Sequence, residues 1–178
     1  LAASFRILEQ VEIESNDRVV VLGAGKLGQL IAQVLNPETK HLLVVGKNDW
    51  KLEILKDMGI ATADVYEPLQ RNHADIVVDA TGSYEGFTRA IELVRPEGTV
   101  ILKTTITHPT ALEMSVPVVN EIRILGSRCG PFRPALEALA TGRVTVGPLV
   151  SESFDLDQGV RALQRARARE VMKVLIHM

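Results

Sequence analysis

The sequence predicts an α/β protein in which helices cover both faces of a doubly wound, parallel β-sheet. Apolar runs rich in valine, isoleucine and leucine alternate along the 178 residues with segments whose apolar residues recur at helical spacing. The apolar runs show no polar alternation, which is typical of parallel strands buried on both faces. Together with the alternating βα order of the segments, this pattern favours a doubly wound sheet.

The first strand and the first helix of this pattern enclose a glycine-rich turn. Residues 18–22, Arg-Val-Val-Val-Leu, lead into the sequence Gly-x-Gly-x-x-Gly and then into a helix over residues 26–35. Gly23 permits a tight turn, Gly25 lets the backbone approach a pyrophosphate, and Gly28 allows close packing of helix on strand. The unpaired N–H groups at the start of the helix then face the phosphates. A Rossmann-type dinucleotide site is therefore expected at Gly23, Ala24, Gly25, Lys26, Leu27 and Gly28.

The remaining elements follow at the spacing of further βα units. Asn36-Pro37 ends the first helix, because the residue before a proline is driven out of the α region. The next helix, residues 49–58, has Asp49 as its expected N-cap and Gly59 as its expected C′ residue. Further strands are expected at residues 41–45, 61–65, 75–79, 99–103 and 121–125, further helices at residues 84–94 and 134–141, and a turn at residues 96–98.

The two ends of the chain carry separate signals. Leu1, Phe5 and Leu8 share one helical face and no initiating methionine precedes them, so the chain is expected to be a piece of a longer protein. From about residue 144 the βα order stops, and a strand at 150–154, an arginine-rich helix at 156–168 and a strand at 171–176 are expected. The sequence therefore predicts a Rossmann domain over residues 1–143 and a C-terminal segment over residues 144–178.

The residue that closes the second strand normally selects the cofactor. An acidic side chain at this place hydrogen-bonds the ribose hydroxyls of NAD and repels the 2′-phosphate of NADP. This chain has Gly46 there, which offers no carboxylate, and Lys47 follows as a cation where the phosphate would lie. Asp49 lies close enough to weaken this signal. We expect Gly46, Lys47 and Asn48 to contact the cofactor, with NADP preferred over NAD.

The fourth strand ends in Asp79-Ala-Thr-Gly at the carboxyl edge of the sheet, where open α/β sheets bind ligands. Ala80 and Thr81 are therefore candidates to line the adenosine side of the crevice. The alternative is an ordinary strand-to-helix turn built from small residues.

Composition excludes several classes of protein. The formal net charge of −2 gives no sign of a nucleic-acid partner or of an anionic membrane surface. No apolar run approaches the roughly 20 residues that span a bilayer. A single cysteine excludes an internal disulfide framework and fits a reducing cytoplasm.

Catalytic constellations are absent from the sequence. Cys129 is expected to be a small buried apolar residue. The four histidines do not have the spacing of zinc ligands, and they are His41, His73, His108 and His177. The chain thus has a predicted cofactor site, no catalytic residues and no metal ligands.

Five blocks of this sequence together resemble the medium-chain dehydrogenase/reductase superfamily, in particular the zinc-type alcohol dehydrogenases and threonine-dehydrogenase-like proteins. They are residues 7–28 with the glycine motif, 51–59 (Lys-Leu-Glu-Ile-Leu-Lys-Asp-Met-Gly), 75–82 (Asp-Ile-Val-Val-Asp-Ala-Thr-Gly), 96–100 (Pro-Glu-Gly-Thr-Val) and 154–176. The resemblance implies hydride transfer between an alcohol or polyol and NAD(P), with zinc holding the substrate oxygen. It also implies that a GroES-like domain before residue 1 carries the zinc ligands. On that basis we expect residues 144–178 to pack on the catalytic domain, and the chain alone to bind cofactor without turning over substrate.

The resemblance also places residues that spacing alone supports only weakly. Thr104, Ser127 and Cys129 would lie near the nicotinamide. Family members commonly dimerise through an edge strand, which would here run from Glu121 to Leu125.

Two other classes of function remain open on the sequence. A Rossmann module that senses a nucleotide for a partner protein needs no catalytic residues. A methyltransferase that binds S-adenosylmethionine uses a similar glycine loop, although Gly46 argues against it because such sites usually place an acid there.

Overall fold

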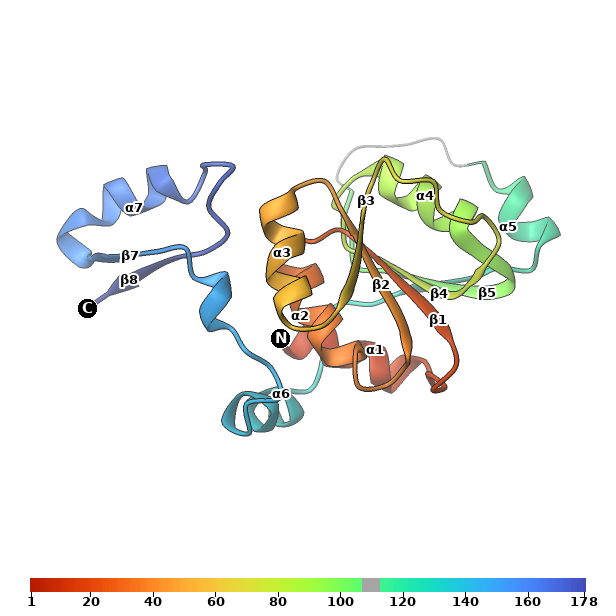
Figure 1. Cartoon of the computed structure of the whole chain (residues 1–178), viewed down its shortest axis with the longest axis horizontal. Helices are drawn as coiled ribbons and strands as arrows, with labels where there is room; N and C mark the ends of the chain where they lie inside the picture. Colours follow the sequence, from red (N-terminus) through yellow and green to blue (C-terminus); the bar gives the residue numbers. More distant parts are fainter. Residues whose placement is uncertain (107–112) are drawn as a thin grey trace.

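The computed structural model describes residues 1–106 and 113–178, and its centre is a six-stranded parallel sheet (Figure 1). The strand order is β3-β2-β1-β4-β5-β6. Its strands are β1 (Arg18–Leu22), β2 (His41–Gly46), β3 (Ala61–Asp64), β4 (Ala74–Asp79), β5 (Val94–Leu102) and β6 (Arg123–Gly126). The chain runs outward from β1 to β3 and then returns to place β4 on the other side of β1. The order therefore reverses between β1 and β4, where doubly wound sheets bind ligands. The predicted fold class is confirmed.

Helices pack on both faces of the sheet. They are α1 (Ala2–Gln10), α2 (Lys26–Leu35), α3 (Asp49–Asp57), α4 (Tyr84–Leu93), α5 (Ser115–Val119) and α6 (Phe132–Ala140). On one face, α1, α2, α3 and α6 bury apolar side chains against alternate residues of the central strands, such as Val19, Val21 and Val44. On the opposite face, α4 packs against the other set, which includes Val77 and Val100. Each central strand thus buries both of its faces, which explains its unbroken apolar sequence.

The connection between β3 and β4 has no helix. Residues 65–73 return across the sheet as turns and irregular chain, and Val65 and Leu69 lie against the apolar cluster on the α4 side. Val20 and Leu43 remain only half-buried on this face. This loop therefore leaves the middle of β1 and β2 only partly covered on this face.

Most expected elements are present with small shifts at their ends. The helix expected at 84–94 ends at Leu93, because Val94 is extended and already begins β5. The turn expected at 96–98 lies inside β5, and Glu97 has a left-handed φ of 60° beside a register shift against β4. The five-residue helix α5 was not expected at all.

The ends of α3 show one expectation that is wrong and one that is confirmed. Asn48, not Asp49, is the N-cap, and its side chain makes no capping hydrogen bond. Gly59 has a φ of 75° and donates to Lys56, while Ile60 donates to Leu55. These two bonds form the Schellman arrangement that satisfies the last carbonyl groups of a helix.

The C-terminal residues form a smaller parallel pair of strands beside a helix (Figure 1). The elements are a 3₁₀ turn η1 (Gly147–Leu149), β7 (Glu152–Asp155), a 3₁₀ turn η2 (Leu156–Gln158), α7 (Gly159–Arg165) and β8 (Val174–His177). The expected helix at 156–168 is thus divided and shorter. Arg165 ties this unit together by bonds to Glu152 and Glu170. Among the residues that the structure describes, no helix has both the length and the apolar character to span a bilayer.

Asp75 joins the start of β4 to its two neighbours at the amino edge of the sheet. Its carboxylate accepts from the backbone N–H of Arg18 at 2.8 Å and from the guanidinium of Arg95 at 2.6 Å. Burial acts to raise the pKa of Asp75, but the hydrogen bonds from Arg95 and Arg18 outweigh it and hold that pKa below its usual value.

We expect Asp75→Asn to lower the free energy of unfolding by about 1–3 kcal/mol at pH 7, because two charge-assisted hydrogen bonds lose their charged acceptor. Since the folded pKa is depressed, this stabilisation is present above the ordinary aspartate pKa of about 3.9 and is lost as the pH falls through the lower folded value. Urea denaturation from pH 7 down to about pH 3 should therefore show a steeper loss in the unsubstituted chain than in the variant. Parallel pH profiles would contradict this role.

Candidate cofactor-binding site

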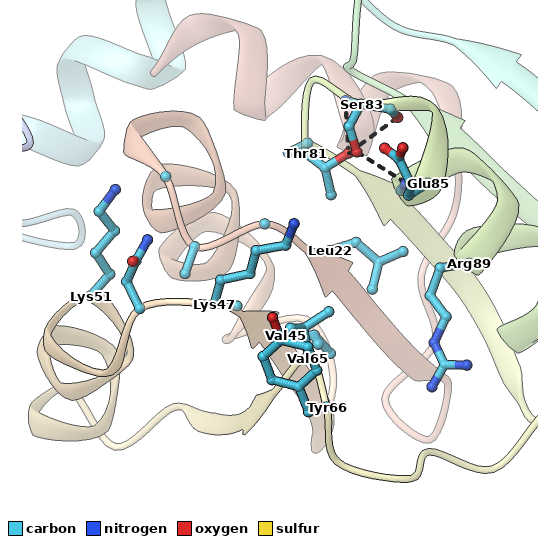
Figure 2. A pocket seen from close by; sticks show the side chains of 17 residues that line it. Leu22, Val45, Lys47, Lys51, Val65, Tyr66, Thr81, Ser83, Glu85 and Arg89 are labelled. Carbon is cyan, nitrogen blue, oxygen red and sulfur yellow. Dashed lines mark hydrogen bonds between the residues drawn. The ribbon is translucent and has the colours of Figure 1, made fainter. Parts of the chain in front are cut away.

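A cavity of about 470 Å³ opens at the carboxyl edge of the sheet, where the order of strands reverses (Figure 2). Its walls are the glycine turn after β1, the ends of β2 and β3, and the start of α4. Of the residues expected to bind cofactor, those that line it are Gly23, Ala24, Gly25, Gly46, Lys47, Asn48, Ala80 and Thr81. Those that lie outside its lining are Lys26, Leu27, Gly28, Thr104, Ser127 and Cys129.

The glycine turn is shaped by two close backbone approaches. A Cβ atom on Gly28 would lie 1.7 Å from the carbonyl oxygen of Gly23, and a Cβ on Gly23 would lie 2.8 Å from that of Ala80. Gly23 also has a φ of 103° and donates its N–H to Val45 at 2.8 Å. These two glycines are therefore required by packing and backbone conformation, irrespective of any ligand.

Gly25 differs from the other two glycines of the motif. A Cβ at this position would have no atom within 4 Å, so the turn is open on the side of the cavity. Gly25 is also the N-cap of α2 and has no side chain to cap the helix. The first N–H groups of a helix have no acceptor within it and attract anions. The turn thus has the free donors and the open space that a pyrophosphate needs.

The end of β2 carries no side chain because there is no room for one. A Cβ on Gly46 would lie 2.8 Å from the Cβ of Ala24 and 2.9 Å from Cδ2 of Leu52. The next residue, Lys47, is exposed at the cavity, and Lys51 stands on the first turn of α3 with its ammonium 5.1 Å from the ring of Trp50. Cations therefore border this wall of the cavity, and no carboxylate stands at the end of β2.

The wall opposite Lys47 belongs to the β4–α4 turn and is rigid. The buried Asp79 accepts from both the N–H and the hydroxyl of Thr81, at 2.9 and 2.7 Å. Ser83 caps α4 by accepting from the N–H of Gly86 at 3.2 Å. These bonds hold Ala80 and Thr81 at the edge of the cavity.

Several cavity residues have no signal in the sequence motifs. They are Leu22, Val45, Lys51, Val65, Tyr66, Ser83, Glu85, Gly86 and Arg89. The Glu85 carboxyl has a pKa below its usual value, because its own backbone N–H, the hydroxyl of Ser83 and the charge of Lys47 together outweigh the effect of burial. Leu22 and Val45 directly precede Gly23 and Gly46 in the chain, whereas only the folded topology brings the others beside the glycine turn.

The ends of β5 and β6 form a separate region. Thr104 accepts from the N–H of Gly82 at 2.9 Å and lines a second, mainly apolar hollow of about 310 Å³. Ser127 is buried and accepts from Nζ of Lys103 at 2.6 Å. Cys129 is exposed, so the expectation that it is buried is wrong. It follows a strand at the edge of the sheet and so receives less cover than a residue in a central strand.

No three histidine, cysteine, aspartate or glutamate side chains gather to hold a metal ion within residues 1–106 and 113–178. His73 instead contacts the guanidinium of Arg18. His108 lies outside the described residues.

Known proteins are similar to this chain in sequence and in fold. The pattern of the zinc-binding dehydrogenase family matches residues 25–141. Sorbitol dehydrogenase of Halalkalibacterium halodurans is 26% identical over 192 residues, which cover 99% of this chain and 56% of that protein. The chain therefore spans about half the length of the curated relatives it matches.

Two solved structures have the same fold over 99% of this chain. A zinc-binding dehydrogenase from Sinorhizobium meliloti 1021, bound to NADP, has a TM-score of 0.88 at 22% identity and is covered over 57% of its length. An alcohol dehydrogenase from Escherichia coli CFT073, complexed with NADH, has a TM-score of 0.87 at 20% identity and is also covered over 57% of its length. At these sequence identities, the similarity to the two solved structures establishes the fold alone.

Two glycines of the motif should differ in how much an added methyl group lowers the stability of the fold. We expect Gly28→Ala to lower the free energy of unfolding by about 1–3 kcal/mol or more, because the added methyl group meets backbone that cannot move aside. Gly25→Ala is the matched control and should change stability by no more than about 0.5 kcal/mol, since its methyl group enters open space. Chemical denaturation of the two variants compares these values directly. Equal losses would contradict the packing role of Gly28.

Proposed function

Since the chain belongs to the zinc-binding dehydrogenase family, we propose that residues 1–143 are the NAD(P)-binding domain of an oxidoreductase. The longer protein would transfer a hydride between an alcohol or polyol and the dinucleotide. The observation that carries this proposal is the turn at Gly25, where free helix N–H groups border open space at the point of strand-order reversal. This turn would bind the pyrophosphate, with Ala80 and Thr81 beside the adenosine.

We further propose that the site prefers NADP to NAD. Gly46 supplies no carboxylate to repel a 2′-phosphate, while Lys47 and Lys51 supply positive charge on the same wall. Glu85 on the facing wall and Asp49 shortly after Lys47 favour NAD instead, since a carboxylate accepts from ribose hydroxyls. The separate position of Thr104, Ser127 and Cys129 suits the other end of a dinucleotide, because the two halves of such a sheet bind its two nucleotides.

The zinc ion and the substrate would belong to the rest of the longer protein. The described residues contain no group of metal ligands, and the relatives are about twice as long as the matched region. The C-terminal segment, residues 144–178, would pack on that missing part. Leu156, Val160 and Leu163 support this, since they lie on one side of η2 and α7 and are 62–74% exposed. The chain alone would bind cofactor and not oxidise alcohols.

A homodimer would form through β6. This strand is one of the two edges of the sheet, the other being β3, and Val118 and Val119 of the neighbouring α5 are 69% and 80% exposed. An exposed edge strand with apolar neighbours is a template for pairing with a second copy. A cytoplasmic location fits the single free cysteine.

The proposal is tested by calorimetric titration of the chain with NADPH, NADH and S-adenosylmethionine. We expect NADPH to bind more tightly than NADH, and S-adenosylmethionine not to bind. Lys47→Met should weaken NADPH about tenfold, or about 1.4 kcal/mol, and leave NADH unchanged, because only the 2′-phosphate needs the cation.

Two further variants control this measurement. Lys40→Met removes an exposed lysine just before β2, at the opposite edge of the sheet, and should change neither affinity. Gly25→Ala should weaken both dinucleotides together, because they share the pyrophosphate. Tighter binding of NADH than of NADPH would overturn the cofactor preference, and failure to bind either would overturn the proposed function.

The dimer is tested by Ile124→Pro. Ser127 donates its N–H to Leu102 of β5, so alternation along the strand directs the N–H of Ile124 to the unpaired side. Proline at this position removes an outward donor and leaves the pairing with β5 intact. Sedimentation should show a dimer for the unsubstituted chain and a monomer of unchanged helical content for the variant. A dimer that persists in the variant would exclude the β6 edge as the interface.

A further inference from the structure

Gln29 is a fully buried polar side chain in the first turn of α2, directly after the glycine motif. Its amide nitrogen donates to the carbonyl of Lys51 in the first turn of α3 at 2.6 Å, and to the carbonyl of Ala24 in the glycine turn at 3.4 Å. Within the part of the chain that the structure describes, it is the only side chain of α2 that hydrogen-bonds to α3. Gln29 therefore joins the glycine turn to the start of α3.

The amide of Gln29 is used for its donor atoms alone. Its oxygen, Oε1, is buried and has no hydrogen-bond partner among the described residues. A buried acceptor without a partner lowers the stability of a fold, and an apolar side chain of similar length would avoid that cost. Packing in the core therefore gives no reason for a glutamine at this position, whereas its bonds to Ala24 and Lys51 do.

These bonds fix the cationic wall of the cavity relative to the glycine turn. Ala24 and Lys51 both line the cavity, as does Lys47, which follows the end of β2 (Figure 2). Lys47 is positioned by the sheet, whereas the place of Lys51 depends on how α3 is held. The buried Leu52 attaches α3 by apolar packing, which is non-directional. Gln29 adds a hydrogen bond with a defined donor, acceptor and length.

A dinucleotide with a 2′-phosphate would need the turn and the cations at the same time. This step rests on the proposed function, in which the glycine turn binds the pyrophosphate and the lysines bind the 2′-phosphate. Both groups are attached to the same ribose, so covalent geometry limits the distance between them. A wall that is already held in one position need not be ordered on binding. This lowers the cost of binding NADPH but not that of binding NADH, which has no 2′-phosphate.

We propose that Gln29 is a positioning residue for the choice of cofactor, because it holds Lys51 where the 2′-phosphate would lie. Gln29 itself lies outside the lining of the cavity and acts through the backbone of two segments that belong to it. Its removal should weaken the binding of NADPH and leave the binding of NADH unchanged.

The test is the ratio of the dissociation constants of NADH and NADPH, measured by calorimetric titration of the 178-residue chain at pH 7. Gln29→Met has a similar length and removes the donor atoms together with the unpartnered oxygen, so the fold should be retained. The ratio should fall about fivefold through weaker binding of NADPH, since ordering one segment on binding costs roughly that much affinity. An unchanged ratio would overturn the inference and leave the proposed function standing.

Gln33→Met is the matched control. Gln33 lies one turn further along α2 and is also buried, and its amide exchanges two hydrogen bonds with the backbone of Thr145, at 3.1 and 2.7 Å, outside the cavity. This variant should lower the free energy of unfolding, since the N–H of Thr145 loses its acceptor, and should leave the ratio of the two dissociation constants unchanged. A fall equal to that in Gln29→Met would reflect a general loosening of α2 and contradict the positioning role.

A double-mutant cycle shows whether Gln29 acts through Lys51. Lys51→Met should lower the ratio by itself, and adding Gln29→Met should lower it little further, because a cation that has been removed cannot be misplaced. Effects of the two substitutions that multiply would overturn the inference. Circular dichroism checks that each variant folds; if Gln29→Met does not, an unchanged ratio in Lys51→Met would itself overturn the inference. Failure of the unsubstituted chain to bind either dinucleotide would overturn the proposed function as well.

Discussion

The close contact between α2 and β1 is the constraint on which the rest of the site depends. With the Cα of Gly28 against the carbonyl of Gly23, the helix begins directly above the end of the strand. Its first N–H groups therefore point along the carboxyl edge of the sheet instead of into solvent beside it. A larger residue at either position would lift the helix away from the strand, and the donors would no longer converge on the cavity. The anion site is thus a consequence of packing.

The same contact also affects which side chains line the cavity at the end of β2. The N–H of Gly23 is bonded to Val45, which holds the turn beside the end of β2, and Ala24 then covers the Cα of Gly46. Any side chain at position 46 would require Ala24 or Leu52 to shift. Gly46 therefore supplies no side chain to this wall, and the first side chain beyond it is the exposed Lys47.

The sequence was sufficient for the sheet and for the glycine turn, because both depend on local rules. Apolar runs identified the central strands, weaker signals at residues 61–65 and 121–125 identified the two edge strands, and the spacing of the glycines identified the turn. Tyr66, Glu85 and Arg89 could not be found in the same way, since they reach the cavity through the topology of β3 and α4. The exposure of Cys129 was missed for a related reason: its burial depends on how much cover a strand at the edge of the sheet receives, which the local sequence does not encode.

The two halves of the crevice place their cations in different surroundings, and this determines what each cation does. Lys47 is exposed, so water and salt screen it and its interactions weaken with ionic strength. Such a charge suits the recognition of a solvated phosphate. Lys103 is half-buried, held by two neutral acceptors and close to Arg6, so water and salt screen its charge less than that of Lys47. Salt should therefore weaken phosphate recognition at Lys47 more than it weakens the hydrogen bonds of Lys103, because only the charge of Lys47 is fully open to solvent.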